Sequence, residues 1–175
     1  MSFGESNISE DCYNFIRKIL PEGKTILELG SGWGTSELAK HYKMISIEHD
    51  DQWIGEYESD YIYAPIQWYD DNWTAPDIAG NDGWYNVSMI KIHLMDKKYD
   101  MILVDGPPGY PNYKNTGKRI GRGGFYKHLD LFNTDVPIII DDIKRESERI
   151  LMEKISEKLN RPYLILEDKD TGVIQ

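Results

Sequence analysis

The chain has 175 residues, a length that suits one domain of ordinary size and is short for two. Apolar residues make up 40% of it and charged residues 29%, a balance typical of a globular protein and unlike that of a disordered chain. The longest apolar runs, such as Val136 to Ile140, are far shorter than the roughly 20 residues that cross a bilayer. We therefore expect one domain over residues 1–175, with no membrane partner.

Charge and cysteine content narrow the class of protein further. Twenty Lys and Arg against thirty Asp and Glu give a net charge of -10, which opposes binding to nucleic-acid phosphates. The single cysteine, Cys12, cannot form an internal disulfide, and residues 1–9 lack the basic and apolar regions of a secretory signal. We expect a cytoplasmic protein with a reduced, buried Cys12 and no nucleic-acid partner.

The first half of the chain predicts alternating helices and strands. Ser9 has the residue type of a helix N-cap, Glu10 and Asp11 follow in the first turn, and Pro21 ends that helix. The elements expected after it are a strand at Thr25–Leu29, a helix at Thr35–Tyr42, strands at Met44–Glu48 and Tyr61–Ile66, and a helix at Tyr85–Met95.

The second half contains two apolar runs with β-branched residues, Tyr99–Val104 and Val136–Ile140, typical of strands buried on both faces of a parallel sheet. A helix is expected over Ile143–Leu159, and an antiparallel hairpin over Pro162–Leu166 and Gly172–Gln175. Strands that alternate with helices predict an α/β fold with a doubly wound, mostly parallel sheet. In such a fold the ligand lies beyond the carboxyl ends of the strands.

A glycine-rich loop, Glu28-Leu29-Gly30-Ser31-Gly32-Trp33-Gly34, follows the first strand. Glycines there let backbone amides approach a ligand and open a helix N-terminus. A nicotinamide-binding turn would need its third glycine one residue later. The second strand ends in Glu48, 18 residues after Gly30. Together the loop and this acidic residue resemble the E/D-x-G-x-G-x-G region of class I S-adenosylmethionine-dependent methyltransferases.

This resemblance implies a single-domain, Rossmann-like fold with a seven-stranded sheet and S-adenosylmethionine as the cofactor. Residues 24–48 would form the cofactor-binding half, with the ribose hydroxyls on Glu48. The cofactor-binding residues that it implies are Glu28, Gly30, Ser31, Gly32, Gly34, Glu48, His49 and Asp105.

Acidic residues follow the two buried runs: Asp105 after the first, and Asp141 and Asp142 after the second. Neighbouring strands would bring these carboxylates together, which is costly unless a cation or a proton compensates. Oxygen ligands favour Mg²⁺, with Mn²⁺ or Ca²⁺ as alternatives. The pattern resembles catechol-type and sugar-type O-methyltransferases, and implies a metal and acceptor region over residues 99–142. The alternative is that Asp105 is the usual acidic residue of metal-free relatives and Asp142 caps the next helix.

A long basic loop spans residues 106–124, and the stretch from Gly106 to Lys127 carries five basic residues and no acidic one. We interpret this loop as a lid that binds an anionic acceptor, such as a nucleotide-linked sugar. A solvated, partly disordered loop is the alternative. The predicted substrate-binding residues are Tyr110, Lys118, Arg119 and Arg122.

The general base is left open, because Pro107 and Pro108 stand where relatives place it. The candidates for catalysis are Asp105, His128 and Lys114. The hypothesis is transfer of a methyl group from S-adenosylmethionine to a hydroxyl of a sugar or glycan precursor, with a divalent metal. A nucleotide-binding oxidoreductase and a non-catalytic binding module of the same fold are the alternatives.

Overall fold

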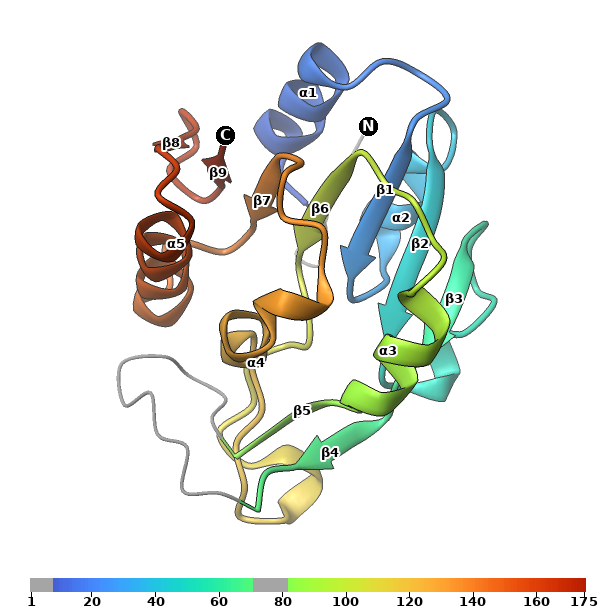
Figure 1. Cartoon of the computed structure of the whole chain (residues 1–175), viewed down its shortest axis with the longest axis vertical. Coiled ribbons are helices and arrows are strands. Elements are labelled where there is room, and N and C mark those ends of the chain that lie inside the picture. Colours follow the sequence, from blue (N-terminus) through green and yellow to red (C-terminus); the bar gives the residue numbers. More distant parts are fainter. Residues whose placement is uncertain (1–7, 71–81) are drawn as a thin grey trace.

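A computed structural model describes residues 8–70 and 82–175. Its main feature is a seven-stranded sheet with the order β3-β2-β1-β6-β7-β9-β8 (Figure 1). The strands are β1 (Thr25–Leu29), β2 (Lys43–Glu48), β3 (Asp60–Tyr63), β6 (Met101–Val104), β7 (Ile138–Ile140), β8 (Tyr163–Ile165) and β9 (Gly172–Ile174). Neighbours from β3 to β7 pair in parallel, whereas β9 is antiparallel to both β7 and β8. The predicted doubly wound sheet with its C-terminal hairpin is confirmed.

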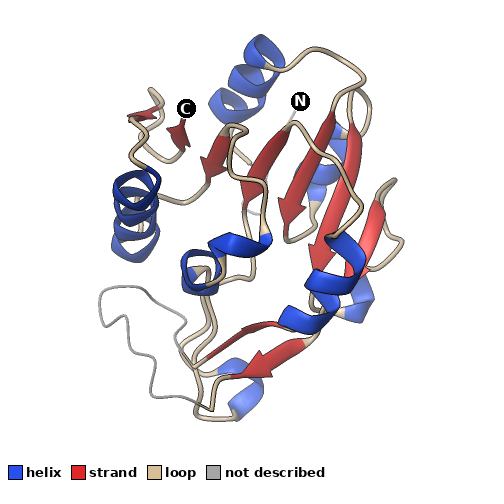
Figure 2. Ribbon diagram, viewed as in Figure 1, coloured by secondary structure: helices blue, strands red, loops and turns tan. Residues whose placement is uncertain are grey.

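Helices cover both faces of this sheet (Figure 2). One face carries α1 (Glu10–Ile19) and α2 (Trp33–Leu38), and the other carries α3 (Val87–Leu94), α4 (Gly123–Lys127) and α5 (Glu146–Leu159). Short 3₁₀ turns are η1 (Asp51–Trp53), η2 (Tyr113–Asn115) and η3 (Leu129–Leu131). In the described part of the chain, no helix combines the length and apolar character needed to cross a membrane.

The two faces of the sheet have separate apolar cores because side chains alternate along each strand. In β6, Ile102 and Val104 pack toward α3, α4 and α5, whereas Met101 and Leu103 pack toward α1 and α2. All four β6 residues are buried. A strand covered on both faces has no solvent side, which explains its uninterrupted apolar sequence.

The start of α1 forms as the sequence predicts. Ser9 is its N-cap, and the Ser9 hydroxyl oxygen accepts a hydrogen bond from the Cys12 amide at 3.0 Å. Cys12 is fully buried, in the core beneath α1. Residues 1–7, most of the polar N-terminal stretch, lie outside the described residues.

The middle of the chain differs from the prediction. The strand expected over Tyr61–Ile66 is two strands, because β3 ends before Pro65 and β4 (Ile66–Trp68) starts after it. Proline has no amide hydrogen to donate to a ladder, so the chain leaves the sheet there. β4 pairs with β5 (Gly83–Tyr85) in a separate two-stranded sheet, and α3 therefore begins only at Val87.

Candidate functional site

A pocket of about 320 Å³ lies at the carboxyl ends of β1, β2, β6 and β7. β1 and β6 are neighbours in the sheet although they are far apart in sequence, so the strand order reverses between them. In open α/β sheets this switch point is where ligands bind. The pocket gathers these predicted site residues: Gly30, Ser31, Glu48, His49, Asp105, Tyr110, Arg122, Asp141 and Asp142.

The loops after β1 and β6 approach each other closely at the floor of the pocket. A Cβ on Gly30 would lie 3.1 Å from the Gly106 Cα, and Gly30 has a φ of +95°. That backbone conformation and that contact both require glycine. Sequence reasoning singled out Gly30 but missed Gly106, whose importance depends on the pairing of β1 with β6.

Glu48 ties the end of β2 to the glycine loop. Its Oε1 accepts hydrogen bonds from the amides of His49 at 2.6 Å and Asp50 at 2.9 Å, and its Oε2 accepts one from the Ser31 amide at 2.9 Å. The His49 Nδ1 lies 2.7 Å from Oε1 without the alignment of a hydrogen bond. Because a carboxylate has about four acceptor positions, Oε2 can accept a further hydrogen bond from a ligand.

Glu28 lies below the pocket instead of lining it. Its Oε1 accepts hydrogen bonds from the hydroxyls of Thr35 at 2.7 Å and Ser46 at 2.5 Å. Burial raises the pKa of Glu28 to about 8, and these two hydrogen bonds oppose that rise. Thr35 in turn accepts a hydrogen bond from the Gly32 amide at 3.0 Å. Glu28 therefore supports the glycine loop from underneath.

Gly32 and Gly34 also lie outside the lining of this pocket. Gly34 faces the N-terminal segment, where a Cβ would lie 3.2 Å from the Ile8 Cγ1. The third glycine of the motif therefore allows α2 to pack closely against Ile8, a role different from the predicted contact with a cofactor.

The side chain of Arg122, which is only 3% exposed, lies among the strand-end residues Asp105, Asp141 and Asp142. Its Nη2 lies 3.0 Å from Asp105 Oδ1 and 2.6 Å from Asp142 Oδ2, and it donates to the Asp105 carbonyl at 2.7 Å. Its Nη1 donates to the Asp141 carbonyl at 2.5 Å. Arg145 adds a second guanidinium, with its Nη1 3.0 Å from Asp142 Oδ2. The site is thus a cluster of three carboxylates and two guanidiniums.

Burial and mutual repulsion raise the pKa values of two acids in this cluster, Asp105 and Asp141. Burial raises the pKa of Asp105 to about 6, and the guanidinium of Arg122 opposes the rise. Burial also raises the pKa of Asp141 to about 7, with a further contribution from the charges of Asp105 and Asp142. Asp141 Oδ1 accepts a hydrogen bond of 3.3 Å from the Thr171 hydroxyl on the loop before β9.

The structure does not support the predicted metal site at Asp105, Asp141 and Asp142. Nη2 of Arg122 fills the space between the first and the last of these carboxylates, where a bridging ion would lie. Within the described ranges, no group of three or more His, Cys, Asp or Glu side chains has the arrangement of a metal site. The alternative role of Asp142 as a helix cap is also not seen, because the N-cap of α5 is Arg145.

Two of the proposed catalytic residues lie away from the pocket lining. His128 ends α4 and stacks on Trp84, with ring centroids 5.6 Å apart. Lys114 is exposed, with its Nζ 5.3 Å from the centre of the Tyr113 ring. Of the three candidates, only Asp105 lines the pocket.

The predicted anion clamp of Lys118, Arg119 and Arg122 is not assembled. The Arg119 Nε donates to Asp82 Oδ2 at 3.2 Å, and the Lys118 Nζ lies over the Trp68 ring at 5.0 Å. Arg122 instead turns inward to the carboxylates. The loop folds back on itself, because Tyr110 and Ile120 exchange two backbone hydrogen bonds of 3.1 Å. The three basic side chains therefore contact different parts of the protein and do not converge on one anion site.

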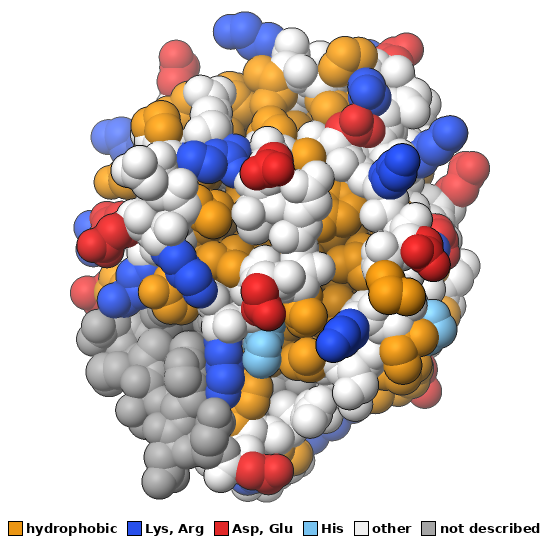
Figure 3. All heavy atoms as spheres, viewed as in Figure 1, with side chains coloured by type: hydrophobic (Ala, Val, Ile, Leu, Met, Phe, Trp, Pro, Cys, Tyr) orange, Lys and Arg blue, Asp and Glu red, His pale blue; other side chains and the backbone are white. Residues whose placement is uncertain are grey.

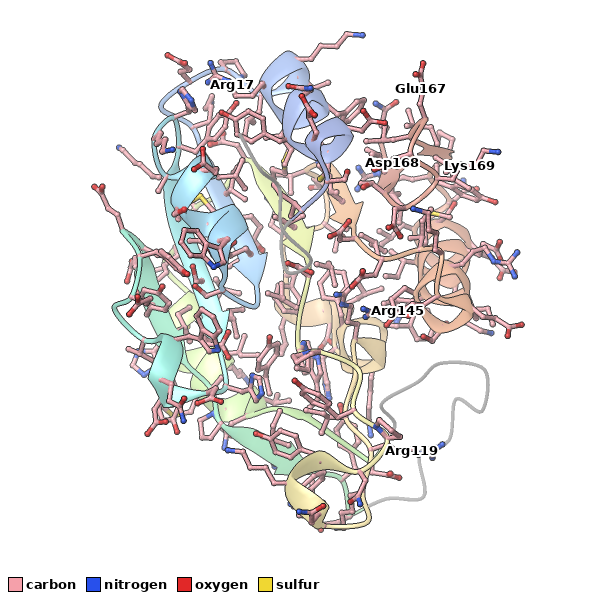
Figure 4. All side chains as sticks on the ribbon, turned by 180° about the vertical axis from the view of Figure 1, so that it is seen from behind. Arg17, Arg119, Arg145, Glu167, Asp168 and Lys169 are labelled. Carbon is pink, nitrogen blue, oxygen red and sulfur yellow. The ribbon has the colours of Figure 1, made fainter. Side chains whose placement is uncertain are left out.

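Sequence reasoning missed four residues that line the pocket: Trp53, Gly106, Pro108 and Arg145. Figure 4 shows Arg145 near the middle of the molecule and Arg119 below it, while Arg17 and Lys169 lie toward the opposite end. Acidic and basic side chains are interspersed on the face in Figure 3. Arg145 follows Asp142 by three residues, but no local pattern marks it as a site residue.

Comparisons with known proteins bear on the fold. A TehB-like S-adenosylmethionine-dependent methyltransferase from Corynebacterium glutamicum is 14% identical, and the match covers 94% of this chain and 85% of that one with a TM-score of 0.50. Aeropyrum pernix fibrillarin, solved with natively bound S-adenosylmethionine, is 12% identical, with 88% of this chain covered and a TM-score of 0.44. The present chain spans 66% of the length of that fibrillarin. No protein-family model and no curated protein matches the sequence. The structural likeness and the strand order establish that the chain has the Rossmann-like fold of S-adenosylmethionine-dependent methyltransferases.

Proposed function

We propose that this protein binds S-adenosylmethionine at the switch point and transfers its methyl group to a hydroxyl oxygen. The observation that carries the proposal is the convergence of Gly30, Ser31, Glu48 and Asp105 in one pocket at the carboxyl ends of β1, β2 and β6. These residues come from separate parts of the chain and match the methyltransferase motif in order. The fold shared with the corynebacterial methyltransferase supports the same cofactor.

The cofactor would lie across the ends of β1 and β2. Glu48 Oε2 has acceptor capacity for a ribose hydroxyl, since among the described residues only the Ser31 amide donates to that oxygen. Trp53, which is 38% exposed, lines the same pocket and offers an aromatic face for the adenine ring.

Asp105 is the residue that we place at the reacting oxygen. When bound, S-adenosylmethionine supplies a methyl group on a positively charged sulfur. The pocket must align the acceptor hydroxyl with that methyl group, and Asp105 would take the hydroxyl proton. Asp105 lines the pocket, and its pKa of about 6 suits a base near neutral pH. His128 and Lys114 do not line this pocket.

We propose a sugar or a glycan precursor as the acceptor, with its anionic group near Arg145. The Arg145 side chain is 55% exposed at the edge of the pocket. A second hollow of about 210 Å³ shares Tyr110 and Arg145 with the main pocket and also contains Arg119. A phosphate there would meet two guanidiniums, which are good donors to phosphate oxygens, and they would offset the carboxylate of Glu148 that also lines this hollow. This arrangement replaces the clamp predicted from the sequence.

Calorimetry with S-adenosylhomocysteine tests the cofactor assignment. Glu48→Ala should weaken binding by about tenfold or more, because the ribose loses a charged acceptor. Trp53→Ala should also weaken binding, and we expect this variant to fold because the Trp53 side chain is partly exposed. Glu157→Gln, an exposed change on α5, is the matched control. Affinity for NAD with none for S-adenosylhomocysteine would instead favour the oxidoreductase alternative.

Turnover with phosphorylated and neutral sugars tests the acceptor and the base. Asp105→Asn should lower kcat by about 10²–10⁴-fold and remove the rise of the rate through about pH 6 that ionisation of Asp105 causes. Arg119→Ala combined with Arg145→Ala should raise the KM for phosphorylated acceptors only. An unchanged pH profile in Asp105→Asn would exclude Asp105 as the base.

A further inference from the structure

Three carboxylates at one edge of a sheet need positive charge, and the structure shows where that charge comes from. Nη2 of Arg122 lies 3.0 Å from Asp105 Oδ1 and 2.6 Å from Asp142 Oδ2. An ion that bridged the same two oxygens would lie about 2.0–2.6 Å from each of them. Such an ion and Nη2 would occupy the same volume, so the two are mutually exclusive.

The guanidinium is anchored, since it also binds the backbone. It donates to the carbonyl of Asp105 at 2.7 Å and to the carbonyl of Asp141 at 2.5 Å, the residues that directly follow β6 and β7. Arg122 itself is the N-cap residue of α4, whose Gly124 packs on Trp84 so closely that a Cβ would lie 2.1 Å from its Cγ. Backbone and helix contacts therefore hold the side chain inside the cluster.

Charge in the cluster is already nearly balanced. The carboxylates of Asp105 and Asp142 pair with the guanidiniums of Arg122 and Arg145, so these four groups carry no net formal charge. A divalent ion would make the cluster positive, and it would bring another cation against a buried guanidinium. Asp142 has a φ of +62°, a conformation unfavourable for a residue with a side chain, and ion pairs with both arginines hold it there.

We propose that Arg122 is the resident cation of this carboxylate cluster and takes the place that a divalent metal ion would otherwise occupy. The carboxylates would bind a metal ion only when the guanidinium is removed. This proposal concerns cation binding only, so its test does not depend on whether the protein binds S-adenosylmethionine or transfers a methyl group.

The test is a titration of the purified full chain with Mn²⁺, in which electron paramagnetic resonance measures the concentration of the free ion. We expect no specific Mn²⁺ binding by the unmodified protein, and a melting temperature that is the same in EDTA and in Mg²⁺. Arg122→Ala should bind Mn²⁺ at least about tenfold more tightly than any weak, nonspecific binding by the unmodified protein. Mn²⁺ should also raise the melting temperature of this variant. Arg145→Ala, which removes an exposed guanidinium from the same cluster, should gain much less.

Adding Asp142→Asn to Arg122→Ala should abolish the gained binding. Tight Mn²⁺ binding by the unmodified protein that is lost in Asp142→Asn would overturn the proposal, and this measurement decides the question even if Arg122→Ala does not fold. A folded Arg122→Ala protein that binds Mn²⁺ no better than the unmodified chain would also overturn it. Calorimetry with S-adenosylhomocysteine on the same samples reports on the cofactor site independently.

Discussion

The acidic residues in and beneath the pocket are stabilised in different ways on its two sides. On the β1 and β2 side, hydroxyls and backbone amides surround the carboxyl groups of Glu28 and Glu48. On the β6 and β7 side, the carboxylates of Asp105 and Asp142 pair with arginines. The first side therefore keeps polar, cation-free acceptors for a ligand, whereas the second forms a network of ion pairs.

This difference shows that acidic residues in similar positions in the sequence need not have similar chemistry. Every one of these residues lies in or just after a strand of a parallel sheet, and each is wholly or partly buried. The donors that reach them decide whether they hold a proton, accept amide hydrogens or pair with a cation. On the β6 and β7 side the guanidiniums come from the N-caps of α4 and α5, and on the other side the donors come from the glycine loop, β2 with the residues that follow it, and the first turn of α2.

The largest expected effect is loss of the ion-pair network. Arg122→Ala should lower the free energy of unfolding by about 3 kcal/mol, because it removes a buried guanidinium and leaves the partly buried carboxylates of Asp105 and Asp142 without their shared partner. Arg145→Ala, at an exposed position, should lower it by no more than about 1 kcal/mol. Urea unfolding of both variants measures the difference. Equal effects would mean that the two arginines are equivalent and that burial does not distinguish them.

A smaller effect is expected from Gly124→Ala, which pushes α4 away from the core. The new Cβ would lie 2.1 Å from the Trp84 Cγ, an overlap that should cost about 1–3 kcal/mol of stability and displace Arg122. Gly109→Ala is the control, since a Cβ there meets no atom within 4 Å. The cofactor side should keep its affinity for S-adenosylhomocysteine, and a large loss of that affinity would contradict the separation of the two sides.

The cofactor side should show its own dependence on pH. Burial raises the pKa of Glu28 to about 8, so the folded protein retains a proton that the unfolded chain has released above about pH 4.5. Stability contributed by Glu28 therefore falls as the pH rises between these values. Glu28→Gln should remove this fall, which amounts to about 1 kcal/mol between about pH 7 and pH 8.

Comparison with Glu28→Gln isolates Glu28 from the acids on the other side, because those acids titrate in both proteins. Asp105, with a pKa of about 6, is largely ionised above pH 7, whereas Asp141, with a pKa of about 7, still loses part of its proton in this interval. Thermal melts of the two proteins in matched buffers measure the difference. Parallel pH curves would show that Glu28 is already ionised at neutral pH.

The smallest effects should come from single hydroxyl donors on each side. Ser46→Ala removes a hydrogen bond of 2.5 Å to Glu28 and one of 2.6 Å to Ser59, and Thr171→Val removes hydrogen bonds of 3.3 Å to Asp141 and to Asp168. We expect losses of about 1 kcal/mol and about 0.5 kcal/mol, respectively, in chemical unfolding at neutral pH. A larger loss for Thr171→Val would show that hydroxyl donors matter more on the arginine-rich side than its ion pairs indicate.

Much of the fold was predictable because it depends on short segments. The strand at Thr25–Leu29 has the predicted bounds, and the runs that contain β6 and β7 were identified by their uninterrupted apolar residues. The N-cap at Ser9 and the C-terminal hairpin were likewise predictable from local residue types. In each case the signal is a periodicity or a turn residue within about ten positions.

The candidate site was predictable only in part. Strand ends and a glycine loop can be located in the sequence, so Gly30, Glu48, Asp105, Asp141 and Asp142 were all expected at the pocket, where the structure places them. The expected bridging cation was inferred from the acids alone. The sequence predicted Arg122 as part of an anion-binding lid, because nothing in the residues around it indicates that it turns inward.

By itself, the sequence determined which residues stand at the carboxyl ends of the strands, since alternation and apolar runs locate those ends. Only the tertiary structure decided what neutralises them. Arg122 reaches Asp105 across 17 positions and Asp142 across 20, through a helix that Gly124 seats against Trp84. Contacts of this kind depend on how α4 packs on the core, and packing between distant segments has no periodic signature in the sequence.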